Sequence, residues 1–170
     1  MEVSVPDPNA LKSGGEFKLI QADLILSNGH VVGLDKSIMG LTIFEGIDQI
    51  ALTGNMMIQD AFNIASFGPI VGQEYLKLKI ATPGLEDSED HILDYSKNAF
   101  MVTSIDDRVS IGSGVQASSI SFCSREFIAN QRNRISRKMT GTYSEIVKTI
   151  LRNDLDSNKK FYNEPSVDNK

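Results

Sequence analysis

The sequence contains little of what several classes of function require. Cys123 is the only cysteine in 170 residues, which rules out an internal disulfide and a cysteine-based zinc cage. No apolar run approaches the roughly 18 to 20 residues that cross a bilayer, and residues 1–16 lack the basic start and apolar middle of a signal peptide. We therefore expect a protein without membrane contact, made and kept in a cytoplasm or in something assembled there.

Histidine is also scarce, and no catalytic grouping can be read from the chain. His30 and His91 lie far apart, and neither belongs to a His-x-x-x-His or His-x-Glu arrangement, so we interpret both as surface residues. Cys123 follows Phe122 in an expected strand with no histidine near it in sequence, and packing explains it better than nucleophilic chemistry. We expect no metal, no cofactor and no enzymatic activity.

Charge is negative overall but unevenly distributed. The net charge of −5 argues against a general nucleic-acid binder. Acidic residues concentrate between Glu86 and Asp107, whereas basic residues concentrate between Arg125 and Arg152. This layout suits head-to-tail contact between copies of one protein, although two solvated faces are the simpler interpretation. The acidic loop at 85–94 lacks the alternating ligands and central glycine of a calcium loop, so we expect it to be solvated.

A period of two runs through most of the chain and predicts β-strands. In "EYLKLKI" at 74–80 the apolar and polar residues alternate, and the segment at 18–26 places Ile20, Ala22, Leu24 and Leu26 on one side. The "SNG" at 27–29 then supplies a tight hairpin turn. Further strands are expected at 30–38, 40–47, 52–60, 99–105, 115–124 and, as a short one, 134–139. Short strands separated by turns predict an antiparallel barrel or sandwich.

One strong helix is expected near the end of the chain. Thr142 and Glu145 form a capping-box pattern at the start of a helix over about 142–153, and its apolar stripe should pack across one end or face of the barrel. A second helical turn fits around 124–131. The predicted organisation is an N-terminal arm at 1–15, a β-barrel domain at 16–154 and a polar connector at 155–170 that leads toward further domains.

The stretch "GPIVGQE" at 68–74 poses a choice between a functional loop and a structural corner. Gly68 and Gly72 lead into a strand rather than a helix, and no Lys-Ser/Thr pair follows, which argues against a phosphate loop. Glu74 has no His, Cys or second carboxylate at a spacing that would indicate general-base catalysis. We interpret it as a carboxylate that makes a structural hydrogen bond or ion pair. An enzyme using Glu74 or the acidic loop is the least favoured hypothesis, because no partner group can be named.

Several segments, taken in order and spacing, carry a resemblance. They are "GLTIFEGID", "LTGNMMIQDAFNI", "GPIVGQEYLKLKI", "FMVTSIDD", "SFCSREFI" and "NRISRKMTGTYSEIVKTILRND". From about Leu19 to Pro165 the chain resembles the N-terminal part of the baseplate central hub protein of contractile-tailed phages (myoviruses). The resemblance implies a mainly β fold: an antiparallel β-barrel of the tail-tube type with a flanking C-terminal α-helix. Gly54, Gly72 and Glu74 would then occupy corner and edge positions.

The resemblance also implies a function. In that family each hub chain carries two barrels, and three chains form a ring that joins the sixfold tail tube to the threefold central spike. This implies a non-enzymatic structural subunit of the virion baseplate, assembled in the host cytoplasm. Its partners would be itself as a trimer, the tail tube protein, the central spike protein and other baseplate proteins. The genome would pass through a polar lumen without specific binding. Family members usually continue past a segment like "KKFYNEPS" into further domains, where this chain stops.

Two alternatives stay open at the level of sequence. The same architecture serves as the hub of a phage-tail-like bacterial contractile injection system, which only neighbouring genes would distinguish. From a different class, a small β-barrel could bind single-stranded nucleic acid through Arg132, Arg134, Arg137 and Lys138. Such sites usually interleave aromatic residues, and none occurs between Asn130 and Gly141.

Within the hub hypothesis, two groups of residues are candidates for contacts with other subunits or the tube. The first is the outward row Tyr75, Lys77 and Lys79, and the second is the basic set Arg132, Arg134, Arg137 and Lys138. Plain solvent exposure is an equally good interpretation of both. The expected core consists of Leu24, Leu26, Ile43, Ile58, Leu76, Leu78, Ile80, Val102, Ile120, Phe122, Ile146, Val147 and Ile150.

Overall fold

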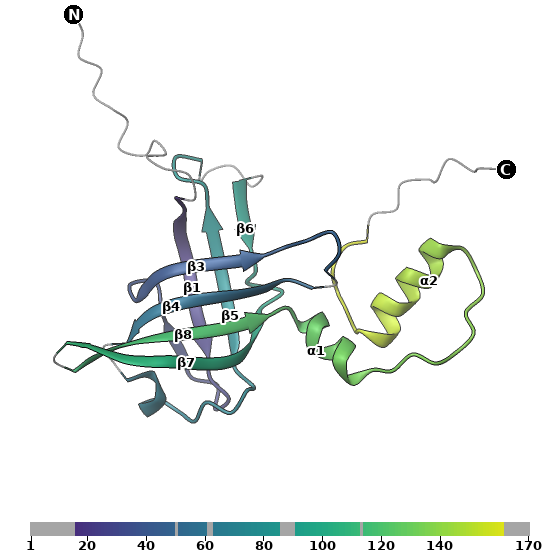
Figure 1. Cartoon of the computed structure of the whole chain (residues 1–170). Helices are drawn as coiled ribbons and strands as arrows, with labels where there is room; N and C mark the ends of the chain where they lie inside the picture. Colours follow the sequence, from purple (N-terminus) through teal and green to yellow (C-terminus); the bar gives the residue numbers. More distant parts are fainter. Residues whose placement is uncertain (1–15, 50, 61–62, 86–90, 113, 162–170) are drawn as a thin grey trace, which may run out of the picture.

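The protein is a mainly antiparallel β structure with a small helical unit beside it (Figure 1). The computed structural model describes residues 16–49, 51–60, 63–85, 91–112 and 114–161. The expected arm at 1–15, residues 86–90 of the acidic loop and the end of the connector lie outside the described residues. Within the described residues, the prediction of a mainly β, antiparallel fold is confirmed, whereas the strands do not close into a barrel.

Eight strands form one antiparallel sheet, in the order β2-β1-β5-β7-β8-β4-β3, with β6 paired to β5. The chain forms β6 where no strand was expected; the strand expected over 30–38 is reduced to β2, and the one expected over 40–47 begins two residues earlier as β3. The strands are β1 (Lys18–Ile25), β2 (Val31–Gly33), β3 (Ile38–Phe44), β4 (Thr53–Asp60), β5 (Tyr75–Ala81), β6 (Ile92–Asp94), β7 (Phe100–Gly112) and β8 (Val115–Cys123).

The sheet folds over into two layers whose strands cross (Figure 1). One layer contains β1, β5 and β6, and the other contains β3, β4, β7 and β8. The two ends of the strand order, β2 and β3, are joined by the four residues Leu34–Ser37. This bend bridges the layers, because Leu34 N donates to Ala22 O (2.7 Å) and Ser37 O accepts from Gln59 N (2.7 Å). The described strands leave the sheet open, since β2 and β3 do not pair with each other.

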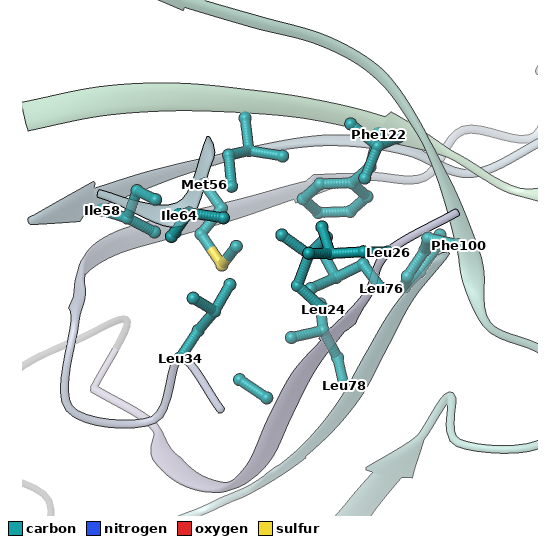
Figure 2. Close-up of a cluster of buried hydrophobic side chains, with 13 residues drawn as sticks. Leu24, Leu26, Leu34, Met56, Ile58, Ile64, Leu76, Leu78, Phe100 and Phe122 are labelled. Carbon is teal, nitrogen blue, oxygen red and sulfur yellow. The ribbon is translucent and has the colours of Figure 1, made fainter. Parts of the chain in front are cut away.

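The hydrophobic core lies between the two layers (Figure 2). Phe122 from β8 packs against Phe100 from β7, with ring centroids 4.8 Å apart. Gly54 in β4 lies directly under the Phe122 ring, where a Cβ would collide with the ring and lie 2.7 Å from Thr42 O. Gly54 is therefore a close-packed position within a strand rather than a corner of the fold. The buried cluster is Ala22, Leu24, Leu26, Leu34, Met56, Ile58, Ile64, Leu76, Leu78, Phe100, Val102, Ile120 and Phe122.

A bulge in β1 corrects one expected face. The register between β1 and β5 shifts between Leu19 and Gln21, so one extra residue enters β1 there. Ile20, expected inside with Ala22 and Leu24, is instead 42% exposed, and Leu19 packs against the core. A one-residue shift reverses the faces of every residue beyond it, which strict alternation in the sequence does not reveal.

The helical unit differs most from expectation. It consists of α1 (Arg125–Arg132), α2 (Tyr143–Thr149) and a π-helical turn, η3 (Ile150–Asp154). The predicted helical turn around 124–131 is confirmed as α1. The capping box of α2 is also confirmed: Glu145 N donates to Thr142 Oγ1, and Thr142 N donates to Glu145 Oε2 (2.9 Å).

The expected packing of α2 across the barrel is wrong. Figure 1 shows α2 beside the sheet rather than on it, and none of its side chains is buried. Ile146 and Ile150 are only half-buried, and Val147 is 44% exposed. The space between the layers is already filled by strand residues, so the stripe of α2 has no core to enter.

Two smaller predictions are corrected as well. Residues 134–139 form no strand, because they run between the two helices away from the sheet and have no neighbouring strand to pair with (Figure 1). Ile43 and Ile80 are half-buried at the margin of the core rather than inside it. The remaining eight expected core residues are buried; seven lie on strands, and Leu26 directly follows β1.

Candidate assembly interface

The corner before β5 is held by Glu74. This side chain is completely buried, and its carboxylate accepts from Val71 N at Oε1 and from Gly72 N at Oε2, both at 2.8 Å. Gly72 has φ +84, a left-handed conformation that glycine adopts without strain. Each carboxylate oxygen thus accepts a hydrogen bond from a backbone amide of the turn. The structural interpretation of Glu74 is confirmed.

The outward row of β5 lies on the sheet as expected. Tyr75 is 40% exposed, while Lys77 and Lys79 are half-buried. Lys79 Nζ lies 3.5 Å from Asp94 Oδ2 on the neighbouring strand β6. The pKa of Asp94 is lowered chiefly because Ser96 hydrogen-bonds to it, with a smaller contribution from the Lys79 charge. Lys79 is thereby committed to a pair within the chain.

The basic segment lies on the helical unit, separate from that row. Arg137 Nη2 lies 2.6 Å from Asp154 Oδ2, so one of the four candidate cations already has a partner. Arg132, Arg134 and Lys138 are exposed. The structure brings the two groups together at one point only, where Tyr75 and Arg132 line the same cavity of about 280 Å³.

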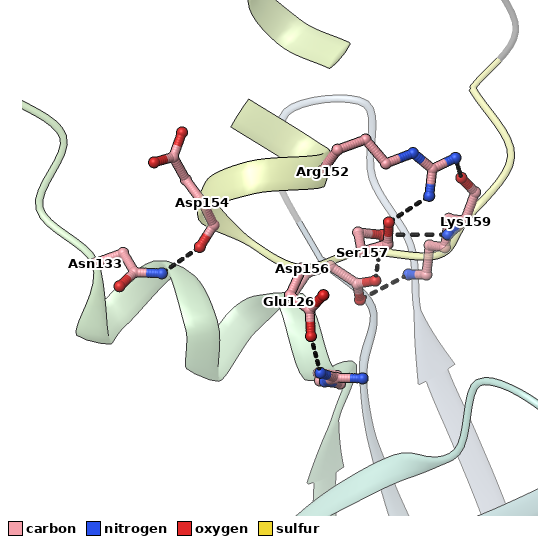
Figure 3. Close-up of polar contacts among 8 residues, drawn as sticks. Glu126, Asn133, Arg152, Asp154, Asp156, Ser157 and Lys159 are labelled. Atoms are coloured by element: carbon pink, nitrogen blue, oxygen red, sulfur yellow. Dashed lines mark hydrogen bonds and ion pairs between the residues drawn. The ribbon is translucent and has the colours of Figure 1, made fainter. Parts of the chain in front are cut away.

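A polar network ties the residues after α2 back onto α1 (Figure 3). Glu126 is only 7% exposed, and it accepts from Ser157 Oγ (2.7 Å) and Lys159 Nζ (3.1 Å). Arg152 donates to the carbonyl oxygens of Ser157 and of Lys159, the latter at 2.7 Å. Burial opposes ionisation of Glu126 most strongly, but hydrogen bonds from Ser157, from the backbone of Glu126 itself and from Lys159, together with the Lys159 charge, outweigh it, so its pKa is lowered.

Two more contacts strengthen this link: Arg125 pairs with Asp156, and Asn133 Nδ2 donates to Asp154 O (Figure 3). Sequence reasoning missed Glu126, Ser157 and Lys159 altogether. Glu126 and Ser157 are 31 residues apart in the chain, and both lie in polar stretches with no pattern that would pair them. Part of the expected connector, residues 155–161, is therefore held by polar contacts rather than by apolar burial.

The outward face of β4 and β8 is uncharged and mostly polar, with Met57 as a large apolar member. Asn55 lies opposite Ser121 and diagonal to Ser119, and Asn55 Nδ2 donates to Ser119 Oγ (2.6 Å) and less closely to Ser121 Oγ (3.4 Å). Met57, Gln59 and Ala117 continue the same face. This part of the surface carries no ionisable side chain on either strand.

Besides the short strands β2 and β6, two longer stretches of strand edge have no partner within the described ranges. β3 pairs only with β4. β7 pairs with β5 only through Phe100 and Met101, so from Thr103 to Gly112 its outer edge is open. The β7–β8 hairpin projects beyond the crossing layer, on the side opposite the helices (Figure 1). Val109 and Ile111 on it are 57% and 50% exposed. Open edges are where one chain can add to the sheet of another.

No reactive grouping is present in the described part of the chain. It holds no cluster of three or more His, Cys, Asp or Glu side chains able to hold a metal ion. Cys123 is buried, and burial raises its pKa, which suits a packed thiol better than a nucleophile. His30 and His91 are exposed. Among the described helices, none is long and apolar enough to span a membrane.

Comparison with known proteins adds no family. No protein-family model matches the chain, and no curated protein matches it significantly. The surface just described is therefore the basis for a functional assignment.

Proposed function

We propose that the protein is a structural subunit of a phage tail baseplate hub, a ring that joins the tail tube to the central spike. The observation that carries the proposal is the pair of open edges, on β3 and on β7 from Thr103 to Gly112, in a mainly β chain. Two edges on one subunit allow each copy to join two neighbours, which is what ring closure requires. The proposal makes the chain non-enzymatic and places it in the virion, assembled as a trimer.

The uncharged face of β4 and β8 supports the same assignment. A ring through which a genome passes needs a lumen that does not retain phosphates, and Asn55, Ser119 and Ser121 supply neutral hydroxyl and amide groups. Exposed cations would bind the passing nucleic acid. Placed toward the axis, this face would let the genome pass without specific contacts.

The shape of the chain is compatible with a barrel of the tail-tube type. The bend at 34–37 hydrogen-bonds to β1 through Leu34 N and to β4 through Ser37 O. The two layers enclose a single core. The helical unit then flanks the barrel. Tyr75 and Lys77 lie on strand β5, and Arg134 and Lys138 lie on the surface of the helical unit. These residues are the proposed contacts with neighbouring subunits, the tail tube protein, the spike protein and other baseplate proteins.

Electron microscopy of the purified full-length protein tests this proposal. We expect ring-shaped particles with a central opening and threefold symmetry, which bind isolated tail tubes at one face. Particles without an opening, combined with no binding to tube or spike subunits, would contradict it. The same images would also fit the hub of a bacterial contractile injection system, which shares the architecture, so the genes beside this one decide between the two.

Binding of single-stranded nucleic acid is a weaker hypothesis in light of the structure. Arg137 is engaged by Asp154, and the exposed cations Arg132, Arg134 and Lys138 lie on a segment without aromatic side chains for base stacking. A salt-sensitive signal in a filter-binding assay would favour it again.

A further inference from the structure

A groove of about 460 Å³ lies where the sheet meets the helical unit. Its lining comes from β5, from the turn before β7, and from the first turn of α1 with the segment that folds back over it. A second cavity of about 280 Å³ adjoins it, since Tyr75, Arg125 and Asp156 line both. Together they form an elongated site, which is suited to an extended segment more than to a compact small molecule.

The charge that this groove leaves uncompensated is positive. Its two carboxylates are already engaged, Glu126 by Ser157 and Lys159 and Asp156 by Arg125. Lys77 and Lys97 also line the groove, and neither forms an ion pair with any described residue.

Asp23 is the nearest competitor for Lys77. It lies opposite Lys77 in the β1–β5 ladder, but its carboxylate accepts from Gln21 Nε2 at 2.6 Å. Among the described residues no ion pair joins Asp23 to Lys77, so the ammonium groups of Lys77 and Lys97 are both available to an incoming anion.

Ser124 is a second, independent observation that indicates a ligand-binding site. It is the N-cap residue of α1, lines the groove and is only 4% exposed, yet its Oγ has no hydrogen-bond partner in the described part of the chain. A buried hydroxyl without a partner is rare, because leaving it unsatisfied costs free energy. The first turn of the eight-residue helix α1 lies beside it, and helix N-termini attract anions.

We propose that this groove binds an acidic peptide segment of a partner protein, with one carboxylate of the segment between Lys77, Lys97 and the Ser124 hydroxyl. The adjoining cavity then takes an apolar side chain of the same segment, because Met101, Ile128 and Leu155 contribute to its lining. The inference does not depend on the proposed hub function, since it concerns a groove within one chain and not the open edges.

Fluorescence anisotropy with a labelled octapeptide of alternating glutamate and leucine tests the proposal on the full-length protein. The same peptide with every glutamate replaced by glutamine is the matched control. We expect saturable binding of the acidic peptide that weakens as salt is raised, and at least about tenfold weaker binding of the neutral one. Equal binding of both peptides, or no binding, would overturn the proposal. Tighter binding of a labelled oligodeoxythymidine than of the acidic peptide would also overturn it.

Substitutions locate the site. Lys77→Glu combined with Lys97→Glu is expected to weaken acidic-peptide binding about tenfold or more, whereas Lys148→Glu, the same change on exposed α2, should leave it unaltered. Ser124→Ala should keep or slightly raise the melting temperature, since it removes a buried hydroxyl without a partner, but it should weaken peptide binding by about threefold or more. Undiminished binding in both variants would overturn the assignment even if the protein forms rings.

Discussion

Gly54 shows how one residue can fix the distance between a strand and an aromatic ring. Phe122 lies over it inside the core and Thr42 O lies behind it, so neither neighbour can move aside. An added methyl group must therefore displace backbone or a buried ring, which is the situation in which overpacking is most costly.

Gly54→Ala is expected to lower the free energy of unfolding by about 3 kcal/mol. Gly40→Ala in the neighbouring strand β3 is the matched control: a Cβ there meets nothing within 4 Å, so a change within about 0.5 kcal/mol is expected. Urea denaturation followed by circular dichroism measures both. Equal stability of the two variants would show that the close approach to Phe122 does not constrain the fold.

Glu74 acts through its two oxygens rather than through its charge alone. Glu74→Gln replaces one acceptor by an NH₂ group that faces a backbone N–H, and we expect a loss of about 2 kcal/mol in the free energy of unfolding. Gln73→Ala, at the exposed neighbouring position, should change stability by less than about 0.5 kcal/mol. Denaturation midpoints compare them, and a neutral Glu74→Gln would refute the role of the carboxylate in the turn.

At the scale of elements, α2 depends on its own cap because no side chain of it is buried. Thr142→Ala removes the acceptor for Glu145 N, and we expect the helix to lose about 1 kcal/mol of stability. Thr140→Ala, just outside the helix, serves as control. Hydrogen exchange of the α2 amides should accelerate about fivefold in the first variant only, and equal exchange in both would contradict the prediction.

The segment after α2 should respond to acid through Glu126. Its pKa in the folded protein is below the ordinary value of 4.5, so its contribution to stability is complete above that value and is lost as the pH falls through the lower folded value. Protonation weakens the contacts with Ser157 and Lys159. The backbone amide of Lys159 donates to Ser157 Oγ, the hydroxyl that Glu126 holds. Protection of this amide against hydrogen exchange should therefore decrease in acid.

Glu126→Gln should lower this protection already at neutral pH and remove most of its acid dependence. Glu45→Gln, at an exposed position, should leave the acid dependence in place. An acid response that persists in Glu126→Gln would assign it to another group.

Local patterns in the sequence predict the strands well and the placement of the helical unit poorly. The alternation around Leu76 and Leu78 fixes both a strand and its inner face, because β5 is regular there. The bulge at Ile20 depends on the pairing of β1 with β5, which no local pattern contains. The apolar stripe of α2 predicted a buried face, but burial also needs a free surface to pack on. The network around Glu126 joins residues whose polar character alone gives no sign of a partner.

At the scale of the whole molecule, the proposed ring depends on the open edge of β7. Val109→Lys places a charge on that edge, which natural sheets use to prevent pairing between chains. We expect self-association of the full-length protein to weaken about tenfold or more, with the melting temperature preserved. Ile47→Lys, at a fully exposed loop position, is the matched control and should assemble normally. Sedimentation velocity over a range of concentrations compares the two variants.

The mass of the purified full-length protein in solution tests the central claim most directly. Native mass spectrometry or mass photometry should detect a closed particle with the mass of three chains, stable on dilution and dispersed by Val109→Lys. A single-chain mass at every concentration, with the fold intact, would contradict the account of this chain as a ring-forming subunit.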